Sequence, residues 1–276
     1  MAGNHHRQAD IMPAEPVRAI PPAISIIIPT WNTRDLTMRC LDAVIGSTAR
    51  YCEIIVVDNG SMDGTADAVN AWAETVMPPV KVIRNAANVG FSKAVNQAAA
   101  EASDPREALV ILNSDCVVTE GWDRILCNAL RDPERRIGAA GPMSNNVSGP
   151  QHDPMARYST QAELNDYAAG CFSKHQNERH SVVRLVGFCL AIHPGAWAEI
   201  GELDEQFFPG NFDDDDWCRR AVNAGWELVI CRDAFVHHEG RATFKANGID
   251  YAAAMQVNEV RYVKKWRAEL QREGLL

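Results

Sequence analysis

Short apolar runs rich in β-branched residues alternate along this chain with longer stretches that have helical spacing. The strand-like runs are Ile24–Ile28, Glu53–Val57, Val80–Ile83 and Leu109–Leu112, and helical stretches near Leu36–Gly46, Thr65–Thr75 and Phe91–Ala102 separate them. This alternation predicts β-α units around a mostly parallel sheet. Because the runs are almost continuously apolar, helices are expected to cover both faces of that sheet. The predicted fold class is therefore α/β, with a sheet flanked by helices.

The pattern becomes less regular after Arg131. Gly138–Lys174 is rich in Gly, Pro, Asn and Ser and is expected to form a long irregular excursion. Beyond it the sequence predicts a strand at Val182–Ile192, a helix at Asp213–Ala224, a strand at Glu227–Cys231 and a final helix at Tyr251–Arg272. In this last helix an apolar stripe predicts packing against the core, with a basic membrane or partner surface as the alternative; the stripe is Val260, Val263, Trp266 and Leu270.

Composition limits the classes of protein that fit this pattern. The chain has 276 residues, 46% of them hydrophobic, and a net charge of −9, so it can build a core but lacks the basic surface of a nucleic-acid binder. Eight scattered cysteines without a C-x-x-C pair favour buried thiols in a reducing, cytoplasmic setting. No apolar run approaches the roughly 20 residues that cross a bilayer. Residues 1–22 lack the apolar core of a secretory signal and are expected to be a disordered tail.

The ends of the first two strands carry polar residues that suit a nucleotide. The turn Pro29-Thr30-Trp31-Asn32 lacks the G-x-G-x-x-G fingerprint, which disfavours a Rossmann dehydrogenase. The second strand ends at Asp58, and a turn with Gly60 and Asp63 follows. Two interpretations remain open: Asp58 accepts hydrogen bonds from a base or ribose, or Asp58 and Asp63 are turn and cap residues.

The fourth strand ends in Asn113-Ser114-Asp115, where a carboxylate directly follows a buried run. Because the carboxyl ends of parallel strands meet at one edge of a sheet, Asp115 and Asp58 are expected near the same edge. A carboxylate there can bind Mg²⁺ or Mn²⁺, which takes further ligands from water and substrate phosphates. The structural alternative is an N-cap for a helix that begins near Gly121.

Four adjacent carboxylates, Asp213 to Asp216, form the most unusual stretch. A favourable helix-dipole interaction of roughly 0.3–1 kcal/mol explains one or two of them but not all four. Helical spacing puts Asp213 and Asp216 on the face of Arg220 and leaves Asp214 free to act. Further along, His237 and His238 follow a strand and offer either a metal ligand or a satisfied surface residue.

Taken together, these motifs resemble the family-2 inverting glycosyltransferases, which have the glycosyltransferase A-type, nucleotide-diphospho-sugar transferase-like fold. The likeness covers about residues 24–47, 53–123 and 186–240. It rests on ordered elements: Pro29-Thr30-Trp31-Asn32, Val57-Asp58-Asn59-Gly60-Ser61, Asp63-Gly64-Thr65, Arg84-Asn85, Asn88, Gly90, Asn96, Asn113-Ser114-Asp115, Gly187, Gly201, Asp204, Asp213-Asp214, Asp216, Arg220 and His237.

The resemblance implies a role for each site residue. Pro29, Trp31 and Asp58 would hold the nucleobase, with Arg84 at the border of that pocket and Asn113 facing the ribose. Asp115 would bind the divalent cation that bridges the donor diphosphate, and His237 would complete the metal shell, with His238 as the alternative. Asp214 would be the general base, with Asp213 as its alternative. The family's metal motif is often Asp-x-Asp, and Asn113 here replaces the first carboxylate.

The implied activity is transfer of a sugar from a nucleotide-diphosphate donor to the hydroxyl of a glycan or glycolipid acceptor, in cell-surface polysaccharide or glycolipid synthesis. It needs Mg²⁺ or Mn²⁺ and allows peripheral membrane contact. One alternative is a sugar-phosphate nucleotidyltransferase, although the Gly-rich basic loop expected of that class after the first strand is missing from this sequence. The other is a non-catalytic nucleotide- or sugar-binding module. The implied organisation is a catalytic domain at 23–245, with a nucleotide-binding half at 23–123 and an acceptor half at 124–245, followed by a C-terminal helix within 246–276.

Overall fold

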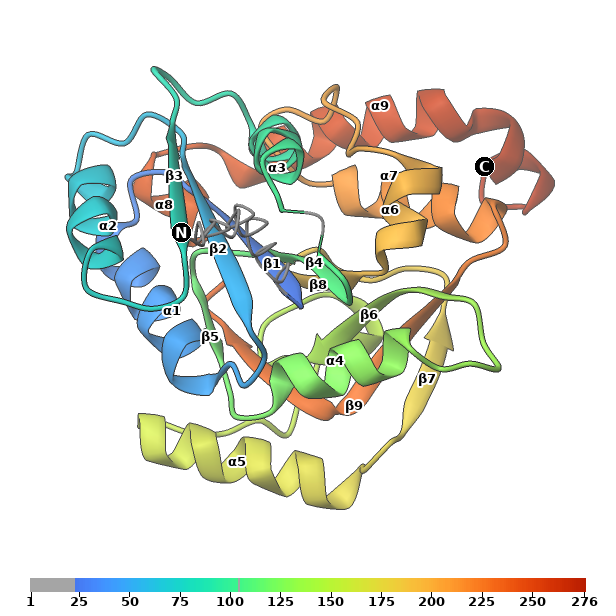
Figure 1. Ribbon diagram of the computed structural model, residues 1–276. Helices are drawn as coiled ribbons and strands as arrows, with labels where there is room; N and C mark the ends of the chain where they lie inside the picture. Colours follow the sequence, from blue (N-terminus) through green and yellow to red (C-terminus); the bar gives the residue numbers. More distant parts are fainter. Residues whose placement is uncertain (1–22, 104) are drawn as a thin grey trace, which may run out of the picture.

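The computed structural model describes residues 23–103 and 105–276, which form a mixed sheet with helices on both faces (Figure 1). The predicted disordered tail lies outside the described residues. In the described part the nine strands are β1 (Ile24–Thr30), β2 (Cys52–Asp58), β3 (Val80–Arg84), β4 (Ala108–Leu112), β5 (Cys116–Val118), β6 (Ile137–Met143), β7 (Arg179–Val182), β8 (Cys189–Ile192) and β9 (Glu227–His238). They lie in the order β3-β2-β1-β4-β8-β6-β9-β5, and β7 pairs with β9.

The helices follow the sequence pattern closely in the first half. They are α1 (Arg34–Ser47), α2 (Thr65–Ala73), α3 (Phe91–Ala100), α4 (Trp122–Leu130), α5 (Gln161–Lys174), α6 (Pro194–Ile200), α7 (Asp213–Asn223), α8 (Ala242–Ala246) and α9 (Tyr251–Arg272), with a 3₁₀ turn at Gly149–Gln151. Strands β1, β2, β3 and β4 are mutually parallel, as expected, so their carboxyl ends share one edge. The predicted α/β class is confirmed.

Two hydrophobic cores lie on opposite faces of the sheet. In β1, Ile26 and Ile28 pack toward α1, α2 and α4, whereas Ile27 packs toward α3, α6 and α7. This alternation follows from the two-residue period of a strand. All three isoleucines are fully buried, which explains why these strands read as continuous apolar runs.

Two expectations for the second half were wrong in part. The range Gly138–Lys174 contains most of β6 and the whole of α5, and the irregular part is confined to residues 144–160 apart from the 3₁₀ turn. The range Val182–Ile192 holds the end of β7 and all of β8, because a loop at 183–188 separates them. The last predicted strand is longer than expected: β9 continues past Cys231 to His238.

Helix α9 packs against the acidic helix α7 through part of its predicted apolar stripe. Leu270 is buried and the Trp266 indole N–H donates to the Asp216 carboxylate at 2.9 Å, but Val260 is 64% exposed. Among the described residues no helix combines the length and apolar character needed to span a bilayer. One sheet runs through residues 23–245, so the division into two halves stays a prediction.

Candidate active site

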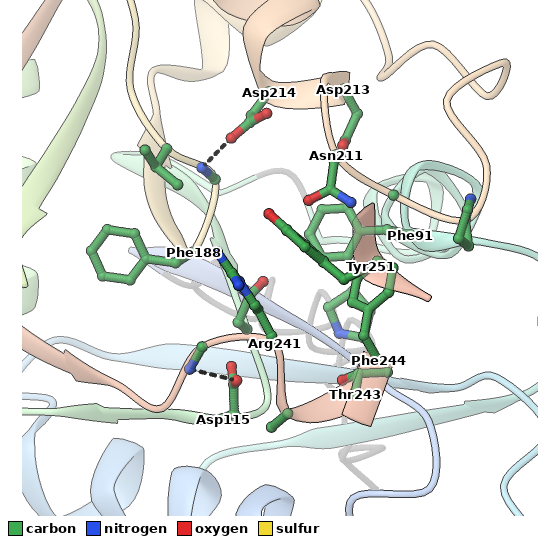
Figure 2. A pocket seen from close by; sticks show the side chains of 18 of the residues that line it. Phe91, Asp115, Phe188, Asn211, Asp213, Asp214, Arg241, Thr243, Phe244 and Tyr251 are labelled. Carbon is green, nitrogen blue, oxygen red and sulfur yellow. Dashed lines mark hydrogen bonds between the residues drawn. The ribbon is translucent and has the colours of Figure 1, made fainter. Parts of the chain in front are cut away.

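A cavity of about 530 Å³ opens at the edge where β1 and β4 end. Pro29 and Trp31 line it from the end of β1, Asn113 and Asp115 from the end of β4, and Asp214 from the start of α7. Figure 2 shows Asp115 and Asp214 on opposite sides of this space. The fold thus brings residues from distant parts of the chain to one cavity, as the sequence predicted for this edge.

Asp115 lies beside His238 at one end of the cavity. The Asp115 Oδ1 to His238 Nε2 distance is 3.2 Å, and the Gly240 N–H donates to Asp115 Oδ2 at 3.1 Å. Burial alone would raise the pKa of Asp115, but the hydrogen bond with His238 and backbone donors outweigh it and hold that pKa below its ordinary value. Asp115 is not the N-cap of α4, because Gly121 occupies that position.

His238 is oriented by the backbone. Its Nδ1 lies 2.9 Å from the carbonyl oxygen of Asn146, which can only accept, so Nδ1 carries the proton. Nε2 is then the nitrogen that faces Asp115 and Asn113: it donates to Asp115 when it carries a proton as well, and it offers a lone pair to a cation when it does not. Phe188 stacks on the ring with centroids 5.2 Å apart. An imidazole nitrogen and a carboxylate oxygen that converge in this way form a donor pair for a divalent cation.

His237 does not line the cavity. Adjacent strand residues point to opposite faces, so His237 points away from Asp115. Its Nδ1 lies 2.7 Å from the Tyr158 hydroxyl and its Nε2 lies 3.2 Å from Glu239 Oε1. Both ring nitrogens are therefore engaged away from the site, and the structure brings His238, the alternative, to Asp115.

Asp58 and Arg84 stand outside the lining of this cavity, although they are paired in the β2–β3 register. Asp58 is buried, accepts from the Ser61 N–H at 3.2 Å, and has no partner for Oδ1. Asp63 accepts from the backbone N–H and the hydroxyl of Thr65, the first residue of α2, while Gly64 is the N-cap residue. Arg84 is exposed and pairs with Asp67 at 2.5 Å.

Asp214 lines the cavity and is held in place by the backbone. Its Oδ2 accepts from the Gly187 N–H at 2.7 Å. Gly187 leaves room for this contact, because a Cβ there would lie 3.1 Å from the Asp214 Cβ. The residue before the helix, Phe212, has a φ of 67°, a strained conformation for a side chain of that size.

The neighbouring aspartates have different surroundings. Burial raises the pKa of Asp213 well above its ordinary value, and the charge of Asp214 adds to this. Burial also raises the pKa of Asp215, to about 7, despite its ion pair with Arg184. Asp216 is fully buried and bonds Arg220, Lys265 and Trp266, as helical spacing predicted for Arg220. Only the first three aspartates line the cavity.

The family model described as "Glycosyl transferase family 2" matches residues 25–192 of this chain. This chain belongs to glycosyl transferase family 2. The chain is therefore a glycosyltransferase, and the carboxylates after β4 and at the start of α7 line its cavity.

Curated relatives of this glycosyltransferase agree with that family. An N-acetylglucosaminyl-diphospho-decaprenol L-rhamnosyltransferase of Mycobacterium tuberculosis is 27% identical, over 90% of this chain and 87% of the relative. Glycosyltransferase AglE of Haloferax volcanii is 25% identical, over 80% of this chain and 68% of the relative.

Solved structures show the same glycosyltransferase A-type fold. The mannosyltransferase PcManGT of Pyrobaculum calidifontis, in complex with GDP-Man and Mn²⁺, matches with a TM-score of 0.57 at 22% identity, covering 84% of this chain and 63% of that chain. GalNAc-T7 with UDP, GalNAc and Mn²⁺ matches with a TM-score of 0.62 at 19% identity, covering 79% and 44%. This chain thus spans less than two thirds of either solved chain.

Sequence reasoning missed several residues that line the cavity of this glycosyltransferase. Arg184 reaches it from the loop between β7 and β8, and Arg241 and Tyr251 reach it from the segment after β9. Their spacing in the sequence does not indicate a functional role, because they stand in irregular segments or at the start of a helix. The nearest signal for Arg241 was its position three residues after His238.

Proposed function

We propose that this family-2 enzyme is a metal-dependent inverting glycosyltransferase that moves a sugar from a nucleotide-diphosphate donor to an acceptor hydroxyl. One observation carries the proposal: Asp214 and the pair Asp115–His238 line the same cavity. The donor would lie with its diphosphate near Asp115, and the acceptor hydroxyl would lie near Asp214. Trp31 and Asn113 line the wall between β1 and β4 and are assigned to the nucleoside.

The residues present fit a divalent cation. Asp115, Cys116 and His238 place one donor atom each within 4.8 Å of one another. Cys116 is fully buried and its Sγ donates to the Phe188 carbonyl oxygen, so Asp115 and His238 are the ligands assigned here. A carboxylate with an imidazole suits Mn²⁺, and the solved neighbours that contain Mn²⁺ support that choice over Mg²⁺. A bound cation would stabilise the negative charge of the departing diphosphate.

The reaction is a single displacement. Asp214 accepts the proton of the acceptor hydroxyl as its oxygen bonds to the anomeric carbon. The bond from that carbon to the diphosphate oxygen breaks on the opposite side, and its electron pair leaves with the nucleoside diphosphate. The Gly187 N–H donates to Asp214 Oδ2 at 2.7 Å and the Asp215 N–H donates to Oδ1 at 2.9 Å, so both oxygens are held in place, and each keeps a lone pair for the acceptor's proton. A positioned base contributes about 10²–10⁴-fold to such a step.

Asp214 is preferred to Asp213 as the base for an electrostatic reason. Burial and the charge of Asp214 raise the pKa of Asp213 well above its ordinary value, which disfavours the ionised form that a general base needs. A protonated carboxyl cannot accept the acceptor's proton. Asp213 remains the alternative if the two exchange roles in the loaded enzyme.

The nucleobase pocket is proposed to extend from the cavity toward Asp58. The unpartnered, buried Oδ1 of Asp58 is the supporting observation, since a buried carboxylate oxygen is costly without a hydrogen-bond donor. An N–H group of the base would supply that donor. Arg84 would border the pocket only after leaving Asp67.

A lipid-linked or cell-surface glycan acceptor is the finer part of the proposal. It rests on the Mycobacterium tuberculosis relative, whose name specifies a diphospho-decaprenol acceptor. A cytoplasmic location with peripheral membrane contact would suit such an acceptor.

A panel of nucleotide sugars, tested by thermal shift with Mn²⁺ and with EDTA, examines the proposal directly. A ligand that binds the native state raises its melting temperature. We expect one sugar donor to stabilise the protein only when Mn²⁺ is present, and to release nucleoside diphosphate on turnover with inversion at the anomeric carbon. Release of pyrophosphate from a nucleoside triphosphate and a sugar phosphate would instead identify a nucleotidyltransferase.

A further inference from the structure

Arg241 is a cationic side chain of the cavity to which the proposed mechanism assigns no role. The cavity of the described residues has two arginines in its lining, Arg184 and Arg241. Arg184 forms an ion pair with Asp215, whereas no carboxylate of the described residues pairs with Arg241. Figure 2 shows Arg241 extending into the space between Asp115 and Asp214.

The turn that carries Arg241 is fastened to Asp115. The Gly240 N–H donates to Asp115 Oδ2 at 3.1 Å, and the Glu239 N–H donates to the Asp115 carbonyl oxygen at 3.1 Å. Gly240 has a φ of 75°, and a Cβ there would lie 2.5 Å from the Asn146 side-chain nitrogen, so any other residue would be strained and would displace Asn146. Arg241 itself has a φ of 61°, which few non-glycine residues adopt. The same carboxylate that faces His238 therefore also sets the direction of Arg241.

Tyr251 holds the guanidinium in place. The Arg241 guanidinium carbon lies 4.3 Å from the centroid of the Tyr251 ring, and Phe244 packs edge-on against that ring with centroids 5.1 Å apart. Stacking occupies the face of a guanidinium and leaves the N–H groups at its edge available. No hydrogen bond involving the Tyr251 hydroxyl is present among the described residues, so Tyr251 positions Arg241 through its ring.

The charge of the cavity explains what this side chain is for. Asp115 and Asp214 line it from opposite sides, and a nucleoside diphosphate would add several negative charges between them. One divalent cation at Asp115 and His238 cannot balance both sets. Guanidinium groups bind phosphate through two parallel hydrogen bonds. We infer that Arg241 binds the donor diphosphate on the side opposite the cation, and that Tyr251 is its positioning residue. This inference rests on the proposed function.

Isothermal titration calorimetry in the presence of Mn²⁺ tests the inference. The probes are UDP and GDP, each compared with its nucleoside monophosphate, and the variants are Arg241→Ala and Arg241→Lys. Lys245→Ala is the matched control, because Lys245 is an exposed cation of α8 that does not line the cavity. We expect Arg241→Ala to weaken diphosphate binding by about tenfold or more, as for loss of a charged hydrogen bond, and monophosphate binding by less than about threefold.

The remaining variants separate binding from folding. Arg241→Lys is expected to recover part of the loss, since it restores the charge without the planar fork. Tyr251→Phe keeps the stacking ring and is expected to bind as the wild type does, whereas Tyr251→Ala is expected to weaken diphosphate binding. Equal loss for monophosphate and diphosphate, or no loss in Arg241→Ala, would overturn the inference while leaving the proposed function intact. A wild-type protein that binds no nucleoside diphosphate, whatever its base, in the presence of Mn²⁺ would overturn both.

Discussion

The two ends of the cavity present carboxylates to the same space in opposite electrostatic surroundings. Asp115 is buried but faces His238 and backbone N–H groups, and its pKa lies below the ordinary value. Asp213 and Asp215 are buried beside another carboxylate, and their pKa values lie above it. One end thus favours an ionised carboxylate that can attract a cation, while the other disfavours ionisation of the two aspartates on either side of Asp214. The environment, more than the residue type, separates the two roles.

The variant Asp214→Asn is the strongest test of the difference between the two ends of the cavity. This change removes the proposed base but preserves size and the contact with Gly187. We expect kcat to fall by about 10²–10⁴-fold, since a positioned base contributes that much. Binding of nucleoside diphosphate should change by less than about threefold, because the donor contacts the other end. Steady-state kinetics and calorimetry on one preparation would measure both, and an active Asp214→Asn enzyme would remove Asp214 from the mechanism.

Asp216→Ala should affect stability and not the cavity. Asp216 is fully buried and holds Arg220, Lys265 and Trp266, so its loss leaves two cations without their buried partner. We expect the free energy of unfolding to fall by roughly 3 kcal/mol. Asp204→Ala is the control, since Asp204 also pairs with Lys265 but is partly exposed and should cost less than about 1 kcal/mol. Denaturant titration of both variants makes the measurement, and equal losses would contradict the assignment.

Two adjacent histidines test the end of the cavity that is proposed to bind the cation. His238→Ala should weaken Mn²⁺ binding by about 10–100-fold, as removal of groups that ligate or orient a metal commonly does. His237→Ala should leave Mn²⁺ affinity nearly unchanged, because both ring nitrogens of His237 face away from Asp115. Titration of Mn²⁺ followed by electron paramagnetic resonance would compare them. The reverse ranking would support the assignment of His237 that the family resemblance suggested.

The smallest expected effect is a change in pH dependence. The pKa of Asp215 is about 7 in the folded protein, against an ordinary value of 3.8, so the folded state holds a proton that the unfolded state has released. Stability is therefore highest below about pH 4 for this group and declines as the pH rises toward about 7. Asp215→Asn should flatten that decline by a few degrees in melting temperature. Parallel melting curves for wild type and variant across this range would contradict the raised pKa.

The sequence predicted the first half of the fold well because β1, β2 and β4 are buried on both faces. Ile26, Ile27 and Ile28 all enter a core, so the run is unambiguous. The later loop at 183–188 carries Leu185 and Val186, whose apolar character made a loop resemble a strand. Helix α5 was missed although Thr160 and Glu163 form a capping box at its start, a signal that the Gly- and Asn-rich surroundings obscured.

Site residues that directly follow a strand could be predicted from the sequence. Those whose position depends on a loop, or on which face of a strand a side chain points to, could not. Asp115 and Trp31 follow strands, and both line the cavity. Choosing between His237 and His238 needed the register of β5 against β9, which pairs Cys116 with His238. Arg241 depended on a left-handed turn fastened to Asp115, and local sequence does not encode that contact.

The central claim is that one cavity joins a cation site at Asp115 and His238 to a base at Asp214. Crystals grown with Mn²⁺ and a nucleoside diphosphate, with diffraction data collected for anomalous scattering from manganese, would test it most directly. The account predicts a manganese peak between Asp115 Oδ1 and His238 Nε2, at a ligand distance of about 2.0–2.3 Å, with the diphosphate bound to it and Asp214 free of metal. A manganese peak among Asp213, Asp214 and Asp215, with none at Asp115, would contradict the account.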